Sequence, residues 1–316
     1  MNYAMIFPGQ GAQRPGMGKD IYDNYVTARM AFEEADEALG FSLSDMIFNG
    51  TPKQLAQTEI TQPAILTVSV AMFRALEQEL GTAVEPVCMA GHSLGEYTAL
   101  VAAGAIPLAD GVRLVHKRGA LMQAAVPLGV GSMAAIIGLD LPTVTEICKQ
   151  AAQNDVCQAA NINSPKQIVI SGHTTAIKRA VEIIKTTTSA KVVPLRVSAP
   201  FHCELMRSVA DKLKAEFGTF CWHTPKVPII ANATALPVRK IQSIRESLYN
   251  QTFSPVMWSQ SVLCMESLGV EGYIELGPGS VLSGLVRKIC KGKRPYAVSD
   301  TEELLAAADY IRGAKK

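Results

Sequence analysis

The sequence lacks a strong charge bias, a long apolar run and any cysteine pair of the kind that binds metal. Among its 316 residues, 30 Lys and Arg are balanced by 28 Asp and Glu, so the formal net charge is only +2. A nucleic-acid-binding surface needs clustered positive charge, so DNA and RNA are not expected partners. No apolar run approaches the ~20 residues that span a bilayer, which predicts no membrane segment.

The cysteine content excludes further classes of protein. Seven cysteines are an odd number, and no Cys-x-x-Cys pair occurs among them. We therefore expect neither a metal site nor a redox couple, but reduced and mostly buried thiols. The N-terminus has no basic flank and no signal-peptide pattern, which together with reduced thiols predicts a soluble cytoplasmic protein. With 48% hydrophobic and 18% charged residues, the composition is that of a globular protein with a large core.

Short apolar runs alternate with amphipathic helical patterns along most of the chain. The run at 3–7 (YAMIF) stops at a Pro-Gly-Gln-Gly loop, which predicts a buried strand followed by a tight turn. Helical patterns follow at about 20–39 and 63–80. Two later runs, VPIIANA at 227–233 and GYIELG at 272–277, predict further buried strands. This order predicts an α/β fold with a mostly parallel central sheet.

The stretch from Gly129 to Val197 follows a different order of elements. The strand-like runs SMAAIIGL, VCQAANI, QIVISG and KVVPLRV are separated by two helical patterns, in the order βαββαβ. This order predicts a ferredoxin-like subdomain inserted into a larger one. We therefore predict a large α/β catalytic subdomain from residues 1–128 and 199–316, and a small subdomain from residues 129–198.

A candidate nucleophile lies where an apolar run meets a helical pattern. Gly91-His92-Ser93-Leu94-Gly95 fits Gly-x-Ser-x-Gly, in which two glycines let the chain turn sharply and present the serine hydroxyl at a helix start. The unpaired N–H groups of that helix start are suited to hold an oxyanion. The same residues also occur in simple turns, but the strand-turn-helix context favours Ser93 as a nucleophile.

A serine nucleophile needs a base, and the chain has five histidines. His202 is the best placed, because it follows a strand-like run and precedes the amphipathic helical pattern at 204–217. A position near a helix start would lower its pKa and keep the imidazole neutral, as a base requires. The alternative is a histidine that only packs locally. Asp110, Asp140 and Asp155 do not follow clear strands, so a group other than a carboxylate is expected to orient the histidine.

Two further features have more than one interpretation. The loop Gly9-Gln10-Gly11 follows the first strand, but Arg14 stands where a dinucleotide-binding loop has its third glycine. The loop is either a tight turn or a means of bringing a backbone N–H to an oxyanion. Arg118 lies on the apolar stripe of a helical pattern. A buried arginine needs an anion, which is either a structural glutamate or the carboxylate of a substrate.

Five motifs in a fixed order resemble one enzyme family. They are FPGQGAQ at 7–13, GHSLGEYTAL at 91–100, APFH at 199–202, NQTFSPVMW at 250–258 and ELGPGSVLSGL at 275–285. Together they are similar to the malonyl-CoA:acyl carrier protein transacylases of fatty-acid synthesis and to the acyltransferase domains of polyketide synthases. The resemblance covers nearly the whole chain, and it implies an α/β-hydrolase-like large subdomain with an inserted ferredoxin-like small one.

The resemblance also implies roles for individual residues. Ser93 is then the nucleophile, and His202 is the general base and acid. The backbone N–H groups of Gln10 and Leu94 form the oxyanion hole, and the backbone carbonyl of Gln251 orients the histidine in place of an acid. The implied substrate-binding residues are Arg118, which grips the malonyl carboxylate, Met122, and Asn161 and Asn163 as contacts of the pantetheine arm.

The expected reaction moves a malonyl group from malonyl-CoA to the phosphopantetheine thiol of acyl carrier protein through a malonyl-serine. Coenzyme A is part of the substrate, and no resident cofactor is expected. A serine hydrolase, such as a thioesterase or patatin-like lipase, would share the elbow but release the acyl group to water. A carrier-binding scaffold without catalysis is the other alternative. The basic cluster of Arg287, Lys288, Lys291, Lys293 and Arg294 either docks an acidic carrier protein or is a solvated helix end.

Overall fold

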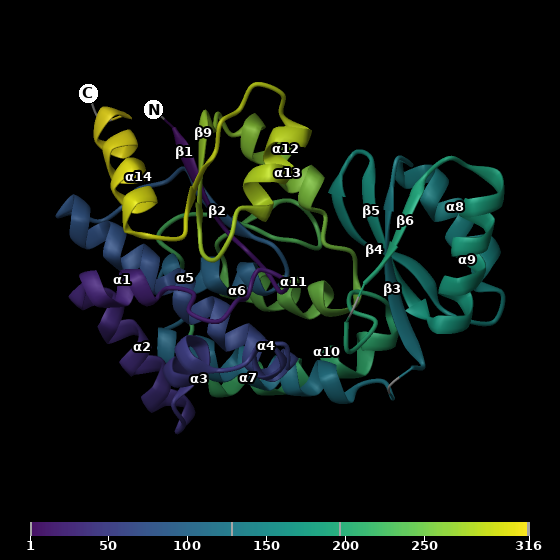
Figure 1. Cartoon of the computed structure of the whole chain (residues 1–316), viewed down its shortest axis with the longest axis horizontal. Helices are drawn as coiled ribbons and strands as arrows, with labels where there is room; N and C mark the ends of the chain where they lie inside the picture. The colour runs from purple at the N-terminus through teal and green to yellow at the C-terminus, as the bar shows by residue number, and fades with distance from the viewer. Residues whose placement is uncertain (1, 128, 196, 315–316) are drawn as a thin grey trace.

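The computed structural model describes residues 2–127, 129–195 and 197–314, which form two subdomains with separate sheets (Figure 1). The larger sheet has six strands in the order β10-β9-β1-β2-β7-β8. Its pairs are parallel except for the short antiparallel pair β7 and β8. These strands are β1 (Tyr3–Phe7), β2 (Cys88–Gly91), β7 (Ile229–Ile230), β8 (Pro237–Val238), β9 (Gly272–Leu276) and β10 (Tyr296–Val298).

The central strand β1 is buried on both faces, which explains why its sequence is a continuous apolar run. Tyr3, Met5 and Phe7 face a core built mainly with helices α2, α5 and α7, while Ala4 and Ile6 face a second core built with α12 and α13. The predicted α/β architecture with a mostly parallel sheet is confirmed. The helices of this subdomain are α1 (Lys19–Asn24), α2 (Val26–Leu39), α3 (Leu43–Asn49), α4 (Pro52–Leu55), α5 (Thr58–Leu80), α6 (Leu94–Ala102), α7 (Leu108–Ala124), α10 (Arg207–Glu216), α11 (Ile241–Phe253), α12 (Trp258–Ser267), α13 (Val281–Ile289) and α14 (Thr301–Ala314).

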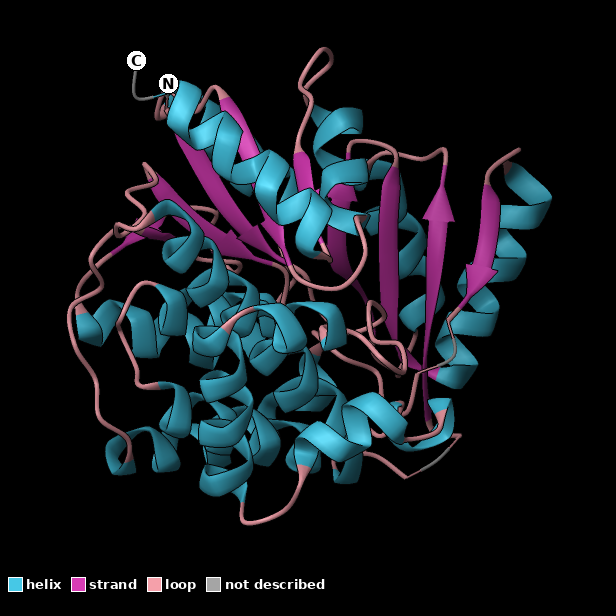
Figure 2. Ribbon diagram, turned by 60° about the vertical axis from the view of Figure 1, so that its left-hand side comes forward, coloured by secondary structure: helices cyan, strands magenta, loops and turns pink. Residues whose placement is uncertain are grey.

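The smaller sheet is antiparallel, with strand order β4-β5-β3-β6. Its elements follow the predicted ferredoxin-like order βαββαβ, and Figure 2 shows its strands beside the larger sheet with its helices on the outer side. Boundaries at residues 129 and 198 stay a prediction. The elements are β3 (Gly131–Ile137), α8 (Leu141–Ala152), β4 (Cys157–Ser164), β5 (Gln167–His173), α9 (Thr174–Thr187) and β6 (Lys191–Pro194).

The two subdomains are joined by backbone hydrogen bonds as well as by the connecting segments. The N–H of Ile162 in β4 donates to the carbonyl of Val256 over 2.9 Å, and the N–H of Val256 donates to the carbonyl of Ala160 over 2.9 Å. This bridge holds β4, the edge strand of the small sheet, against the loop before α12. Within the described residues, no helix combines the length and apolar character needed to cross a bilayer.

Several element boundaries differ from those predicted. The helical pattern at 20–39 is broken at Tyr25, whose extended backbone ends α1 and precedes α2. The helix expected from residue 63 begins at Thr58, so Pro63 lies inside it. Proline cannot donate to the carbonyl of Glu59, but His116 Nδ1 lies 2.8 Å from that oxygen and satisfies it. The strand expected over KVVPLRV ends at Pro194, and its sixth residue, Arg196, lies outside the described residues.

Candidate active site

Ser93 lies at the sharp turn between β2 and α6, at the carboxyl edge of the large sheet. Its backbone has φ 54 and ψ −105, a conformation that costs a non-glycine residue about 1–3 kcal/mol. The turn is tight because a Cβ on Gly95 would lie only 2.0 Å from the carbonyl oxygen of Phe7 in β1. The glycines of Gly-x-Ser-x-Gly therefore let helix α6 start directly against the end of β1.

Ser93 and His202 form a hydrogen-bonded pair. The distance from Ser93 Oγ to His202 Nε2 is 2.8 Å, and His202 Nδ1 lies 2.8 Å from the backbone carbonyl oxygen of Gln251. A carbonyl only accepts, so Nδ1 must carry the proton and Nε2 must be free to accept the serine proton. These two contacts give the tautomer that a general base requires.

The pKa of His202 is lowered to about 3, first by burial and second by the positive charge of Arg118. Its side chain follows the loop before a short 3₁₀ turn at Glu204–Met206, and α10 begins only at Arg207. The helix start that we expected to lower this pKa lies five residues further on, at Arg207, and burial and Arg118 lower the pKa instead. The imidazole is nevertheless neutral across the physiological range, as that expectation required.

No acid among the described residues completes a triad with His202. Asp110 pairs with Arg113, Asp140 caps α8 by accepting from the N–H of Thr143, and Asp155 pairs with Arg179. The acceptor at His202 is instead the carbonyl of Gln251, a fully buried residue near the end of α11. A neutral acceptor fixes the ring without adding a negative charge to the site.

Arg118 in α7 is 1% exposed, and its hydrogen bonds within the described residues all go to neutral groups. Nη1 donates to Gln62 Oε1 over 2.7 Å, while Nη2 donates to Gln251 Oε1 over 3.0 Å and to Ser93 Oγ over 3.1 Å. The guanidinium also lies over the ring of Tyr97, 5.1 Å from its centroid.

The structural glutamate considered for Arg118 is not in contact with it. None of the ion pairs among the described residues includes this guanidinium. Its buried Nε has no hydrogen-bond partner. A cation beside the nucleophile is therefore surrounded by amide oxygens, and it remains open to an anion that enters the site.

Two backbone N–H groups beside Ser93 are free to donate. Neither the N–H of Gln10 nor that of Leu94 donates to another group in the described part of the chain. The loop that carries Gln10 presses against the elbow so closely that a Cβ on Gly9 would lie 2.4 Å from the carbonyl oxygen of His92. Gln10, Ser93 and Leu94 line one cavity, which is the arrangement that an oxyanion hole requires.

The cavity in front of Ser93 has a volume of about 120 Å³, and it adjoins a channel of about 310 Å³, with which it shares the lining residues Gln10, His92, Asn161 and Leu195. Met122 and Asn161 line the cavity and are almost fully buried. Asn163 lines the channel, and its Oδ1 lies 2.8 Å from Nε2 of His92. The channel reaches Val281, which is 57% exposed, so a path runs between the subdomains from the surface to the serine.

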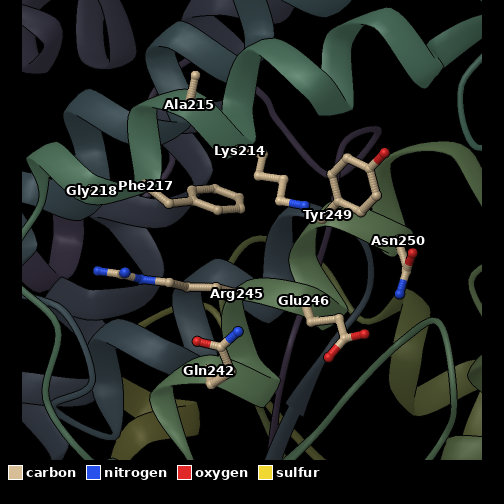
Figure 3. Close-up of a pocket in the computed structure, with 9 residues that line it drawn as sticks. All are labelled: Lys214, Ala215, Phe217, Gly218, Gln242, Arg245, Glu246, Tyr249 and Asn250. Carbon is tan, nitrogen blue, oxygen red and sulfur yellow. The ribbon is translucent and has the colours of Figure 1, made fainter.

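Two other hollows are larger but do not contain the nucleophile. A groove of about 640 Å³ between α8 and the turn at Glu204–Met206 shares only His202 with the Ser93 cavity. Another, of about 510 Å³, lies between α10 and α11 (Figure 3), where Lys214 stacks on Tyr249 at 4.9 Å from the ring centroid. It shares no lining residue with the Ser93 cavity. The volume of a hollow is therefore a poor guide to the active site of this protein.

Two buried polar residues behind the nucleophile, Asn232 and Glu96, were not predicted from the sequence. Asn232, just after β7, accepts from the N–H of Ser93 over 2.7 Å and donates to the carbonyl of Gly91 over 2.7 Å. Glu96 Oε2 accepts from the N–H of Asn232 over 3.0 Å and from Gln251 Nε2 over 2.8 Å. Burial raises the pKa of Glu96 to about 7, against the lowering effect of these two hydrogen bonds and of Arg118.

The residues described in the structure include no group of three or more His, Cys, Asp or Glu side chains that could hold a metal ion. The polar groups at Ser93 are instead those of covalent acyl transfer: a serine with a neutral imidazole base, two free backbone donors and a cation.

Comparisons with known proteins agree in sequence and in structure. The family model described as the acyl transferase domain matches residues 4–315. The malonyl CoA-acyl carrier protein transacylase of Escherichia coli (strain K12) is 43% identical over 307 residues, which are 97% of this chain and 99% of that protein. The crystal structure of an acyl-carrier-protein S-malonyltransferase from Bartonella henselae has 44% identity and a TM-score of 0.96, covering 99% of this chain and 100% of its own.

A second similar structure includes a partner protein. It is a type II PKS acyl-carrier protein in complex with its malonyl-transacylase, with 40% identity and a TM-score of 0.94, covering 98% of this chain and 100% of the matched one. Identity of this level over nearly the full length also supports the predicted two-subdomain fold.

Proposed function

The chain belongs to the acyl transferase domain family, and on that premise we propose that it transfers a malonyl group from malonyl-CoA to the phosphopantetheine thiol of an acyl carrier protein. The group is carried as an ester on Ser93, and the product supplies fatty-acid synthesis. The observation that carries the proposal is the position of Arg118, whose Nη2 lies 3.1 Å from Ser93 Oγ without a carboxylate partner in the described residues. A malonyl group bound to Ser93 places its free carboxylate within reach of that cation.

In the first half-reaction, Ser93 Oγ attacks the thioester carbonyl carbon while His202 Nε2 takes the hydroxyl proton. The N–H groups of Gln10 and Leu94 hold the oxyanion of the tetrahedral intermediate. When the intermediate collapses, its C–S bond breaks, and the coenzyme A sulfur leaves with the proton from His202. The malonyl group is then an ester of Ser93.

In the second half-reaction, the phosphopantetheine thiol of the carrier enters the channel and gives its proton to His202. Its sulfur attacks the ester carbonyl, and the bond between that carbon and Ser93 Oγ breaks. The serine recovers the proton from His202, so the enzyme returns to its starting state. The same base, the same oxyanion hole and the same cation serve both directions.

The acyl-serine must react with a thiol faster than with water. The cavity at Ser93 is small, about 120 Å³, and the apolar side chains of Met122, Leu195 and Phe201 line part of it. Because most of the surface that faces the cavity is apolar, little of it can hold and activate a water molecule, which supports transfer over hydrolysis. The elbow alone would also allow a serine hydrolase, and the apolar surface of the cavity favours the transacylase.

The proposal is tested by the intact mass of the protein after mixing with malonyl-CoA, followed by a chase with phosphopantetheinylated carrier protein. We expect one malonyl adduct in the wild type, its transfer to the carrier, and no adduct in Ser93→Ala, because the alanine has no nucleophilic oxygen. An adduct lost to water in preference to the carrier would identify a hydrolase. Carrier binding without an adduct would identify a scaffold.

A basic cluster beside the channel supports a docking surface for the carrier, since Lys288 donates to Gln167 Oε1 over 3.0 Å and Gln167 lines the channel. Arg287, Lys288, Lys291 and Arg294 are exposed, whereas Lys293 is paired with Glu266 at 3.1 Å. The exposed members form a positive surface that suits an acidic carrier protein.

Reversing two of these charges, with Lys288→Glu and Lys291→Glu together, is expected to raise the KM for carrier protein about tenfold at low salt. The KM for malonyl-CoA is expected to stay at the wild-type value, because the reacting groups are unchanged. The matched control is Lys178→Glu with Lys185→Glu, two exposed lysines on α9 of the small subdomain. An unchanged KM for the carrier in the first variant would contradict the docking surface.

Two narrower statements belong to the same proposal. We propose that coenzyme A acts only as the carrier of the substrate and that the reaction uses no resident cofactor. We also propose a cytoplasmic location, which is supported by seven cysteines that are all free thiols in the structure.

A further inference from the structure

We infer that Asn232 is a positioning residue, whose carboxamide holds the backbone of Ser93 in its strained turn and thereby sets the direction of the nucleophile. This inference rests on the proposed acyl transfer at Ser93. It concerns a residue on a separate segment of the chain, 139 positions away from Ser93, that makes no contact with the Ser93 hydroxyl.

The Asn232 side chain bridges both sides of the elbow. Its Oδ1 accepts from the N–H of Ser93 over 2.7 Å, and its Nδ2 donates to the carbonyl of Gly91 over 2.7 Å. The two contacted peptide groups flank His92, directly before the residue with positive φ. A strained backbone persists only where the surroundings fix it, and this carboxamide supplies a donor and an acceptor at the required places.

Asn232 is itself held rigidly. It is fully buried, its N–H donates to Glu96 Oε2 over 3.0 Å, and its carbonyl accepts from the N–H of Met257 over 2.9 Å. Glu96 lies on α6, the helix that starts at the elbow. Helix α6 therefore fixes the position of Asn232 through Glu96, and Asn232 in turn fixes the backbone of Ser93 at the start of α6. Each nitrogen and oxygen atom of Asn232 therefore has at least one hydrogen-bond partner within the protein.

This arrangement also decides which N–H groups face the substrate. Because the N–H of Ser93 is committed to Asn232, it points behind the nucleophile, while the N–H of the next residue, Leu94, is left free at the cavity. If the elbow relaxed, the N–H of Leu94 and the hydroxyl of Ser93 would move together. Loss of Asn232 is therefore expected to slow attack on any acyl-CoA that the enzyme uses.

The first variant is Asn232→Ala, which removes both side-chain hydrogen bonds. We expect the rate of malonyl-adduct formation to fall about 100-fold, because displacements of ~1 Å at a reacting group have effects of this size. Thermal unfolding and circular dichroism are measured in parallel. A folded Asn232→Ala protein that forms the adduct at the wild-type rate would overturn the inference.

The second variant, Asn232→Asp, separates positioning from a general loss of stability. An ionised aspartate still accepts from the N–H of Ser93, but its second oxygen faces the carbonyl of Gly91, where a donor is needed. A protonated aspartic acid offers one acceptor and one donor, as the asparagine does. Burial and the neighbouring carboxylate of Glu96 both raise the pKa of an acid at this position.

We therefore expect Asn232→Asp to be slow at pH 8 and to recover at least tenfold, relative to wild type, between pH 8 and pH 5.5. The ionisable group in contact with position 232 is Glu96 on α6, and its own pKa, raised to about 7, lies inside this pH window. Arg118 on α7 and His202 lie beyond it around Ser93 and Gln251. These groups are the same in Asn232→Ala, so the pH profile of that variant supplies the background. His202 stays neutral over this range because its pKa is lowered to about 3.

The possible results distinguish failure of the proposed acyl transfer from failure of the positioning role of Asn232. If the wild type forms no malonyl adduct, the proposed function fails, whatever the variants do. If the wild type forms the adduct and Asn232→Asp shows the same pH profile as Asn232→Ala, the carboxamide is not the positioning group and this inference alone is overturned. Recovery of Asn232→Asp at low pH, without recovery of Asn232→Ala, supports it.

Discussion

Replacement of His202 by alanine is expected to slow malonylation of Ser93 by about 10⁴-fold, as measured from adduct mass in a single turnover. The structure gives the reason. Nε2 of His202, at 2.8 Å from Ser93 Oγ, is the one neutral base in contact with the hydroxyl among the described residues, since the other contact is the Arg118 cation. Without the imidazole, the serine must lose its proton to water in a cavity of only about 120 Å³.

Added imidazole provides the control for this variant. The groove of about 640 Å³ that borders His202 opens a route to the space left by the removed ring. We expect imidazole to restore part of the rate in His202→Ala and to leave Ser93→Ala inactive. A His202→Ala enzyme that forms the adduct within tenfold of the wild-type rate would show that another group takes the proton.

The parts of the site that lie on strong local patterns could be predicted from the sequence. Ser93 follows from two glycines between an apolar run and a helix, and His202 from its place after a strand-like run. The burial of Arg118 follows from the three- and four-residue spacing of its apolar neighbours. Each of these patterns lies within a few neighbouring positions of the sequence, because it reflects the strand, turn or helix on which the residue lies.

The residues that hold the site could not be read in the same way. Gln251 was reached only through the resemblance, since its role depends on a backbone carbonyl that any residue possesses. Asn232 follows a strand of two residues and acts across 139 positions, so no periodic pattern marks it. Glu96 did carry a signal in the sequence, because it is the one charged residue among the apolar and small residues of LGEYTALVA, which are all buried in the structure. A charged residue without a solvent-facing side needs an explanation.

In the fold, too, the elements with strong local patterns could be predicted and those that depend on distant contacts could not. The βαββαβ order and the parallel sheet follow from apolar runs of ordinary length, whereas β8 and β10, with two and three residues, are too short to give a pattern. The start of α5 was misjudged because Pro63 is usually a boundary. His116, from a different helix, satisfies the carbonyl that the proline leaves free, and this contact exists only in the folded chain.

The second large effect is expected at Arg118, where replacement by alanine should change which acyl group the enzyme accepts. A malonyl carboxylate in a buried site without its cation is an unpaired charge, which costs about 3–4 kcal/mol and lowers malonylation by ~10²–10³-fold. Acetyl-CoA has no carboxylate, so acetylation of Ser93 is expected to hold or rise. The measurement is the ratio of malonyl to acetyl adducts formed in equal mixtures of the two thioesters.

The matched variant is Arg118→Lys, which keeps the charge but not the planar pair of donors that bonds Gln62 and Gln251 simultaneously. We expect it to lie between wild type and Arg118→Ala in malonylation while keeping a preference for malonyl over acetyl. Unfolding temperatures are needed for both, because removal of the guanidinium leaves two buried amide oxygens unpaired. If malonylation and acetylation fall equally in Arg118→Ala, the arginine acts through the shape of the site. Only a change in their ratio assigns the carboxylate to Arg118, because no effect on Ser93 or His202 distinguishes the two thioesters.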